Sequence, residues 1–167
     1  DIIVFEYENI AGESVVLKYF SLQKLNKDQK EAEKQNLLEE FSLVKRFGGH
    51  SNVVWMYDAK ELYHEGQLVG VYITMEKFDY MLSELIEVDA PFQESDVKDF
   101  LVQMDEVLQT AHYELDKPVI HANIKPDNIG IRKLGGGQYQ YVLMDFQVFK
   151  ELRLQEGSEP RYIVSVR

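Results

Sequence analysis

The hydrophobic pattern of this chain changes its period near Met75, and that change limits the folds that the chain can adopt. Before Met75, apolar residues come in short β-branched and aromatic runs, interrupted by one longer charged segment of helical spacing. After Met75, the longest apolar pattern has the period of a helix. Runs of the first kind are typical of strands, and patterns of the second kind are typical of amphipathic helices. The chain is therefore predicted to be an α+β protein of two parts, or lobes, with strands around one helix up to Met75 and longer helical structure after it.

The first lobe is predicted to cover residues 1–75, with its strands around one helix. Strands are predicted at residues 2–8, 14–20, 53–57 and 68–75, and the helix at residues 26–47. The first two strands are joined by a short glycine-containing turn and are expected to pair as a hairpin. Gly48 and Gly49 come directly after the helix and are a typical helix stop.

The second lobe is predicted to follow, at residues 80–167. A long helix is expected to open with Ser95 as its N-cap. One apolar stripe runs along this helix through Val97, Phe100, Leu101, Met104, Val107, Leu108 and Ala111. The other expected elements are a short helix at residues 80–88, strands at residues 129–132 and 139–144, and a polar, irregular segment at residues 151–167.

Charge and composition exclude several classes of protein. The net charge of −11 disfavours nucleic acid and anionic membrane surfaces as partners, because both attract lysine and arginine. There is no cysteine, so neither a disulfide framework nor a thiol contributes. No apolar run approaches the roughly 18 residues that a membrane helix needs. We therefore expect a cytoplasmic protein whose partners are other proteins. The first residue, Asp1 rather than Met, indicates a piece of a longer chain.

One segment carries most of the chemistry that the sequence indicates. Residues 121–128 read His-Ala-Asn-Ile-Lys-Pro-Asp-Asn, and Asp145-Phe146-Gln147 follows a predicted strand. The first segment resembles the catalytic loop of protein kinases, H-R-D-x-K-P-x-N, and the second resembles their D-F-G motif. This resemblance implies a two-lobed protein-kinase fold, truncated at both ends. Its small antiparallel sheet with one helix would be residues 1–75, its hinge residues 76–79 and its mostly helical lobe residues 80–167.

Three upstream features extend the resemblance. Lys18 ends the run Val-Val-Leu-Lys on a predicted strand, like the lysine of the kinase V-A-I-K motif. Glu40 lies on the predicted helix that follows, before residues 50–54, which resemble the kinase H-P-N-I-V pattern. Residues 72–78 are similar to the kinase hinge, with Met75 as gatekeeper.

The resemblance implies roles for these residues in binding Mg·ATP. Lys18 would hold the α- and β-phosphates, and an ion pair with Glu40 would orient its ammonium group. Glu76 and Phe78 would offer main-chain groups to adenine, next to Met75. ATP and Mg²⁺ are thus the implied cofactors.

The same resemblance makes Asp145 and Asn128 the ligands of Mg²⁺, which takes hard oxygen ligands. Lys125 would neutralise the transferred phosphate. From the residues alone, structural roles remain open: Lys18 as a solvent-facing lysine, Asp145 as a turn residue and Asn128 as a hydrogen-bonding partner of the loop backbone. His121 is expected to be a packed, hydrogen-bonded core residue.

Departures from the family pattern determine the functional prediction. Asn123 stands where kinases have the aspartate that accepts the substrate's hydroxyl proton, and such general-base help is worth roughly 10²–10⁴-fold in rate. Ala122 replaces an arginine, and Gln147 replaces the glycine of D-F-G. Gly130 falls where a bulky apolar residue usually forms the floor under adenine, which should leave that floor shallow. No glycine-rich loop is visible, and residues 157–166 resemble G-T-x-x-Y-x-A-P-E only loosely.

Three functions fit these observations. The first is a pseudokinase domain that acts as a structural or scaffolding subunit in a cytoskeletal or other large assembly, with little or no phosphotransfer. The second is an active or weakly active Ser/Thr-type kinase that tolerates Asn123. The third is a nucleotide-sensing regulatory module that retains Lys18, Asn128 and Asp145. Asn123 and Gln147 favour the first. Nucleotide binding should be weak or absent, and the stripe on the long helix should be partly uncovered.

Overall fold

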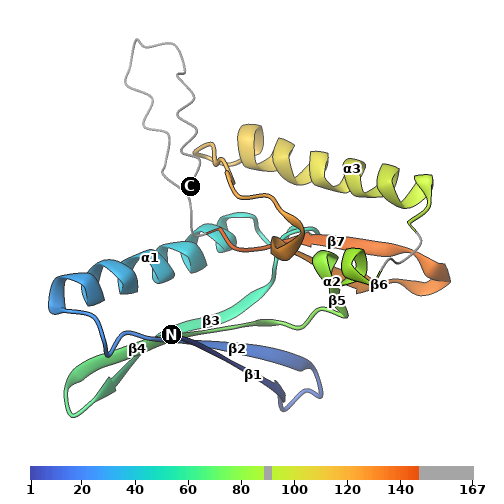
Figure 1. The fold of residues 1–167 in the computed structure, drawn as a ribbon. Coiled ribbons are helices and arrows are strands. Elements are labelled where there is room, and N and C mark those ends of the chain that lie inside the picture. Colours follow the sequence, from blue (N-terminus) through green and yellow to red (C-terminus); the bar gives the residue numbers. More distant parts are fainter. Residues whose placement is uncertain (89–91, 147–167) are drawn as a thin grey trace, which may run out of the picture.

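The computed structural model describes residues 1–88 and 92–146 (Figure 1). Its first part is a sheet of four antiparallel strands, in the order β1-β2-β4-β3, with one long helix. The elements are β1 (Ile2–Glu8), β2 (Ser14–Ser21), α1 (Lys27–Arg46), β3 (Met56–His64) and β4 (Gln67–Glu76). Helix α1 lies over the sheet, and its buried Leu37 and Val44 belong to the apolar core. The α+β class with an antiparallel sheet is therefore confirmed.

Both ends of α1 follow from local sequence. Asn26 Oδ1 accepts a hydrogen bond from Gln29 N (3.0 Å), and Gln29 Oε1 accepts one from Asn26 N (3.1 Å), which forms a capping box. After Arg46 the chain turns through Gly48 and Gly49, whose φ angles are 61° and 82°. Glycine adopts this left-handed backbone without a Cβ clash, so the predicted helix stop is confirmed.

The second part has a three-stranded antiparallel sheet in the order β5-β6-β7. Its elements are β5 (Tyr80–Met81), α2 (Leu82–Glu87), α3 (Glu94–Gln109), a π-helical turn (Thr110–Glu114), a 3₁₀ turn (Pro126–Asn128), β6 (Ile129–Lys133), a second 3₁₀ turn (Gly135–Gly137) and β7 (Tyr139–Leu143). Helix α3 packs against β7, where the Phe100 ring meets the Tyr141 ring edge-on at 5.2 Å. Within the described ranges, every helix is too short or too polar to cross a lipid bilayer.

Residues 53–55 are not part of the first sheet, so the strand predicted at residues 53–57 is wrong for its first three positions. Strand β3 begins only at Met56. Val53 instead forms a parallel bridge with Leu143 of β7, and Val54 N donates to Leu143 O (3.0 Å). The apolar pattern of this segment therefore reflects burial against the second sheet, which joins the two parts of the molecule.

Helix α3 begins one residue before the predicted N-cap. Its N-cap is Gln93, and Gln93 N donates to the Asp96 carboxylate (2.7 Å). Ser95 is already helical and exposed, so its assignment as the N-cap is wrong. The short helix of this part likewise starts at Leu82, because the two residues before it pair with β6.

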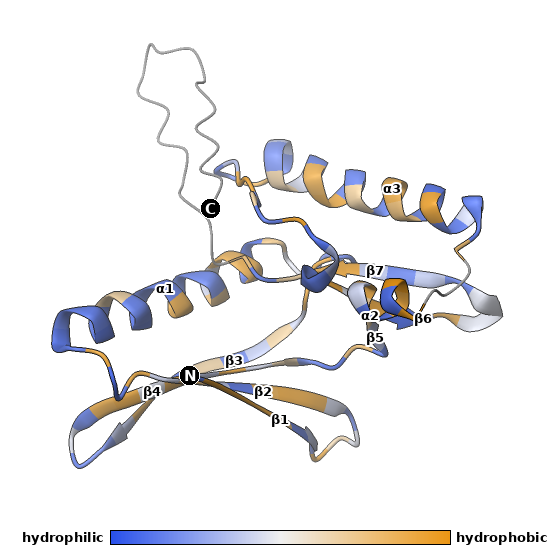
Figure 2. Ribbon diagram, viewed as in Figure 1, coloured by the Kyte–Doolittle hydropathy of each residue, from blue (hydrophilic) through white to orange (hydrophobic). Residues whose placement is uncertain are grey.

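The apolar stripe on α3 is uncovered only in its first half. Leu101 is 60% exposed, and Val97 is also exposed. Met104 and Val107 are buried, so the expected uncovered surface does not extend to them. In Figure 2, hydrophobic and hydrophilic patches alternate along α3, as an amphipathic helix requires.

Candidate functional site

The loop at residues 121–128 is anchored by a buried histidine. His121 is 3% exposed, and its Nε2 donates to Met144 O (3.0 Å). Its Nδ1 accepts a hydrogen bond from Asn123 N (3.3 Å), so the ring is the neutral tautomer protonated at Nε2. Burial lowers the pKa of His121, because the charged imidazolium is poorly solvated there. The predicted core role of His121 is confirmed.

Aromatic rings extend this anchor to α1. The Phe146 ring lies 4.9 Å from the His121 ring and 5.3 Å from the ring of Phe47, which follows α1. Phe146 is 2% exposed. The helix and the loop therefore share one packed aromatic cluster beside Asp145.

The structure brings Asn123, Asn128 and Asp145 together. Asn123 Nδ2 donates to Asp145 Oδ2 across 3.5 Å. Asn128 is buried, and its Nδ2 donates to Asn123 O (2.9 Å). Asn128 O in turn accepts from Met144 N (3.0 Å). Asn128 thus has the loop-bonding role that the sequence left open, and only its Oδ1 remains as a potential metal ligand.

Two residues of this site have left-handed backbone conformations without being glycine. The φ angle is 56° at Ala122 and 64° at Asp145. Such conformations cost on the order of 1–2 kcal/mol for an L-residue. Strained backbone of this kind concentrates at functional sites, where surrounding structure holds it in place. Ala122 is exposed and carries no charge, so no cation faces outward from this position.

Lys18, Glu40, Met75 and Asp145 line one cavity of about 260 Å³, counting the space open to solvent. Phe20, Met56, Ile73 and Met144 complete its wall. Glu40 and Met75 are 5% and 4% exposed. Residues separated by more than a hundred positions therefore meet at one place, as the family resemblance implied.

Lys18 and Glu40 line the same cavity, and the expected ion pair between them stays a prediction. Glu40 is buried, whereas Lys18 is half-buried on β2.

The carboxylate of Glu76 joins the hinge to Trp55 and Arg132. Its Oε2 accepts from Arg132 Nε (2.6 Å) and is also ion-paired with Arg132 Nη2. Its Oε1 accepts from Trp55 N (2.6 Å). Arg132 Nη1 donates further to Ser51 O (3.1 Å) and to Gln140 Oε1 (2.7 Å). Sequence reasoning missed Arg132, since nothing local to β6 marks its partner.

The space over Gly130 is filled by the Phe78 ring, whereas the shallow adenine floor expected there stays a prediction. A Cβ atom added to Gly130 would lie 2.4 Å from Phe78 Cδ2 and Cγ. The Phe78 ring therefore lies on the backbone of Gly130. Lys125, in contrast, is exposed on the loop and is not among the residues that line the cavity. Gln147 and residues 157–166 lie outside the described residues.

The oxygen donors match Mg²⁺ only in part. Asp145 offers a carboxylate and Asn128 an amide oxygen, both hard ligands. Asn123 adds a second amide where a further carboxylate would strengthen the site. No group of three or more His, Cys, Asp or Glu side chains that could hold a metal occurs in the part of the chain that the structure describes. A Mg²⁺ ion here would take its remaining ligands from water or phosphate oxygens.

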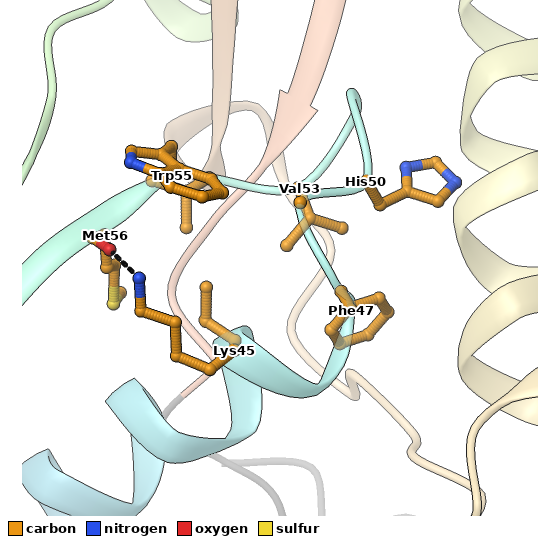
Figure 3. A pocket seen from close by; sticks show the side chains of 9 residues that line it. Lys45, Phe47, His50, Val53, Trp55 and Met56 are labelled. Atoms are coloured by element: carbon orange, nitrogen blue, oxygen red, sulfur yellow. Dashed lines mark hydrogen bonds between the residues drawn. The ribbon is translucent and has the colours of Figure 1, made fainter.

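A second cavity, of about 220 Å³ with its open space, lies at the end of α1 (Figure 3). Lys45 points into it, but Lys45 Nζ already donates to Met56 O (2.5 Å) and lies 4.6 Å from the Trp55 ring centre. Phe47, His50 and Val53 form the rest of the labelled wall. The ammonium group of Lys45 thus links the end of α1 to the start of β3.

A small antiparallel sheet with one helix, a hinge, and a polar loop facing Asp145 define the protein-kinase class of folds. Residues 4–164 match the family model of the protein kinase domain, and the chain belongs to this family.

Similar proteins include kinases of yeast, human and bacterial origin. The chain is 29% identical over 93 residues to the serine/threonine-protein kinase KDX1 of Saccharomyces cerevisiae, which covers 55% of this chain and 21% of that protein. It is 25% identical over 124 residues to human ribosomal protein S6 kinase alpha-2, covering 74% and 16%. It is 33% identical over 100 residues to the probable serine/threonine-protein kinase PknB of Corynebacterium glutamicum, covering 59% and 14%. The chain thus spans only 14–21% of the length of these relatives.

Proposed function

We propose that this chain is a pseudokinase domain that serves as a structural or scaffolding subunit, with little or no phosphotransfer. The observation that carries the proposal is the amide of Asn123, which faces Asp145 and donates to its carboxylate. An amide has no useful proton affinity near neutral pH, so it cannot accept the proton of a substrate hydroxyl. The position that needs a base therefore holds a hydrogen-bond donor.

A further feature supports this proposal. Asn128 donates its side-chain amide to the main-chain oxygen of Asn123, a contact within the loop that requires no nucleotide.

An active or weakly active Ser/Thr-type kinase is the second candidate. The names of the similar proteins favour it, since KDX1 and PknB are described as serine/threonine-protein kinases. The protein kinase family uses ATP and Mg²⁺, and Lys18 and Asp145 share one cavity in this chain. A nucleotide-sensing module would need the same two residues.

Exposed apolar side chains support protein partners for the scaffolding role. Strand β1 lies at the edge of its sheet, and all of its residues are exposed. Ile2, Val4 and Phe5 are more than half exposed. Exposed apolar patches usually mark contacts with other protein segments. With a net charge of −11, we infer partner proteins in a cytoplasmic assembly rather than nucleic acid or a membrane.

The test of the proposed function is phosphotransfer from radiolabelled ATP by the purified full-length protein. Generic substrates and the protein itself serve as acceptors. We expect incorporation no higher than that of the Lys18→Met and Asp145→Ala variants. Turnover that disappears in both variants would establish the active kinase instead.

A second arm tests the scaffolding role in cells that lack the wild-type protein. Lys18→Met and Asp145→Ala remove the groups that catalysis would need, while neither side chain belongs to the buried apolar core. We expect both variants to restore the cellular function, provided that their melting curves match the wild type. Loss of function in both folded variants would contradict a purely structural role.

A further inference from the structure

The phenyl ring of Phe78 occupies the space of a side chain at position 130. A Cβ built on Gly130 would meet Phe78 Cδ2 and Cγ at 2.4 Å and Cδ1 at 2.6 Å. All three distances are below 3.0 Å, which real Cβ atoms essentially never show. Only glycine at position 130 allows the ring to lie there.

The hinge is tied to β6 on both sides of this ring. Before Phe78, the Glu76 carboxylate is hydrogen-bonded to Arg132. After it, Asp79 N donates to Ile131 O (2.9 Å). Gly130 itself is buried in β6, between its partner residues on β5 and β7. The ring is therefore held at this place by fixed backbone on either side.

We propose that the Phe78 ring is an internal plug that excludes a purine base from the hinge side of the cleft. The cavity beside Lys18 reaches Met75 but does not include Phe78 or Gly130 among its lining residues. A planar base stacked on β6 at the hinge would have to displace the ring into water. Exposing an apolar side chain of this size lowers affinity by roughly tenfold to a hundredfold.

This inference rests on the proposed function, which places the nucleotide cleft of the family at the hinge. It predicts that the chain binds purines poorly because of Phe78, independently of the amide at position 123. Shortening the Phe78 side chain should leave an apolar hole above Gly130. Apolar holes of this kind in proteins stay dry and take up planar aromatic molecules.

The test is calorimetric binding of adenosine to the full-length protein and its variants. Adenosine has no phosphate, so its binding does not require Mg²⁺ or any phosphotransfer residue. We expect the Phe78→Ala variant to bind adenosine at least about tenfold more tightly than the wild type. The matched control is Phe100→Ala, which removes another half-buried phenyl ring, packed on Tyr141 between α3 and β7. That control should bind like the wild type.

A second measurement covers the case in which Phe78→Ala is too unstable for calorimetry. Gly130→Ala alone should lower Tm by several degrees, because the new methyl group collides with Cγ and both Cδ atoms of the ring. In the Phe78→Ala background these atoms are gone, so the same change should lower Tm less or raise it. An equal decrease in both backgrounds would show that the two positions do not share space, and the inference would be wrong.

The two proposals fail in different experiments. If wild-type protein binds adenosine as tightly as the Phe78→Ala variant, the ring is no plug, whatever the phosphotransfer assay gives. If labelled phosphate is transferred in a manner that depends on Lys18 and Asp145, the pseudokinase proposal fails by itself.

Discussion

Asn123 has an amide NH2 group where an aspartate would have a second carboxylate oxygen. This single difference places a hydrogen-bond donor where a carboxylate would be a proton acceptor. A carboxylate would accept a proton and repel Asp145, whereas the amide donates to Asp145 Oδ2. The same Asn123 supplies a main-chain oxygen to Asn128. The side chain and main chain of Asn123 therefore join the loop and Asp145 into one hydrogen-bonded unit.

His121 should give the protein a measurable pH dependence of stability. Burial lowers the pKa of His121 below its ordinary value of 6.5, so the unfolded chain binds this proton more readily than the folded one. The free energy of unfolding therefore falls as the pH drops through the unfolded pKa toward the folded one. We expect the His121→Gln variant to lose less stability than the wild type between about pH 7.5 and about pH 5. Urea titrations at each pH measure the difference.

The control for His121 is His64, whose side chain is 77% exposed at the end of β3. His64→Gln should leave the pH dependence of stability unchanged. The His121→Gln variant should also be less stable at neutral pH, because its contact with Met144 O is altered. A pH slope identical to that of the wild type would contradict the assignment of this effect to His121.

At the scale of elements, the start of α3 tests whether Asp96 or Ser95 stabilises the first turn of this helix. Asp96 accepts from Gln93 N (2.7 Å) and lies in the first turn, where its charge favours the helix dipole. Asp96→Ala should therefore lower the free energy of unfolding by roughly 0.5–2 kcal/mol. Ser95→Ala should change it by less than about 0.5 kcal/mol, because Ser95 is exposed and already helical. Urea denaturation compares the two variants, and a larger effect at Ser95 would restore the original cap assignment.

At the scale of the whole molecule, Arg132 joins both sheets. It contacts Glu76 at the end of β4, Ser51 before β3 and Gln140 on β7. Arg132→Gln should lower the free energy of unfolding by roughly 1–3 kcal/mol, since the largely buried Glu76 carboxylate loses its charged donor. Thermal or urea unfolding measures this loss.

Two comparisons make the Arg132 prediction specific. Lys98→Gln breaks an exposed ion pair with Glu94 on α3 and should have no measurable effect. The double variant Glu76→Gln with Arg132→Gln should cost less than the sum of the single changes, because the two side chains form one network. Additive losses would mean that Arg132 acts without Glu76.

The sequence by itself determined the elements whose signals are local. The helix α1 was predicted within one residue at each end, because its Asn26 cap and its glycine stop act on neighbouring residues. The loop around His121 and Asn128 was recognised from contiguous residues. Periodicity and capping depend on atoms close together along the chain, so no knowledge of the fold was needed.

Only the tertiary structure decided which distant side chains meet. Arg132 and Glu76 are 56 residues apart in the sequence, yet they form an ion pair. The Phe78 ring lies on Gly130, although nothing in the sequence indicated that these two positions are in contact. Val53 joined β7 rather than the first sheet. Lys18 and Glu40, which are 22 positions apart, line one cavity together with Asp145. These outcomes depend on how volumes and charges fit across the core, and local periodicity carries no information about that fit.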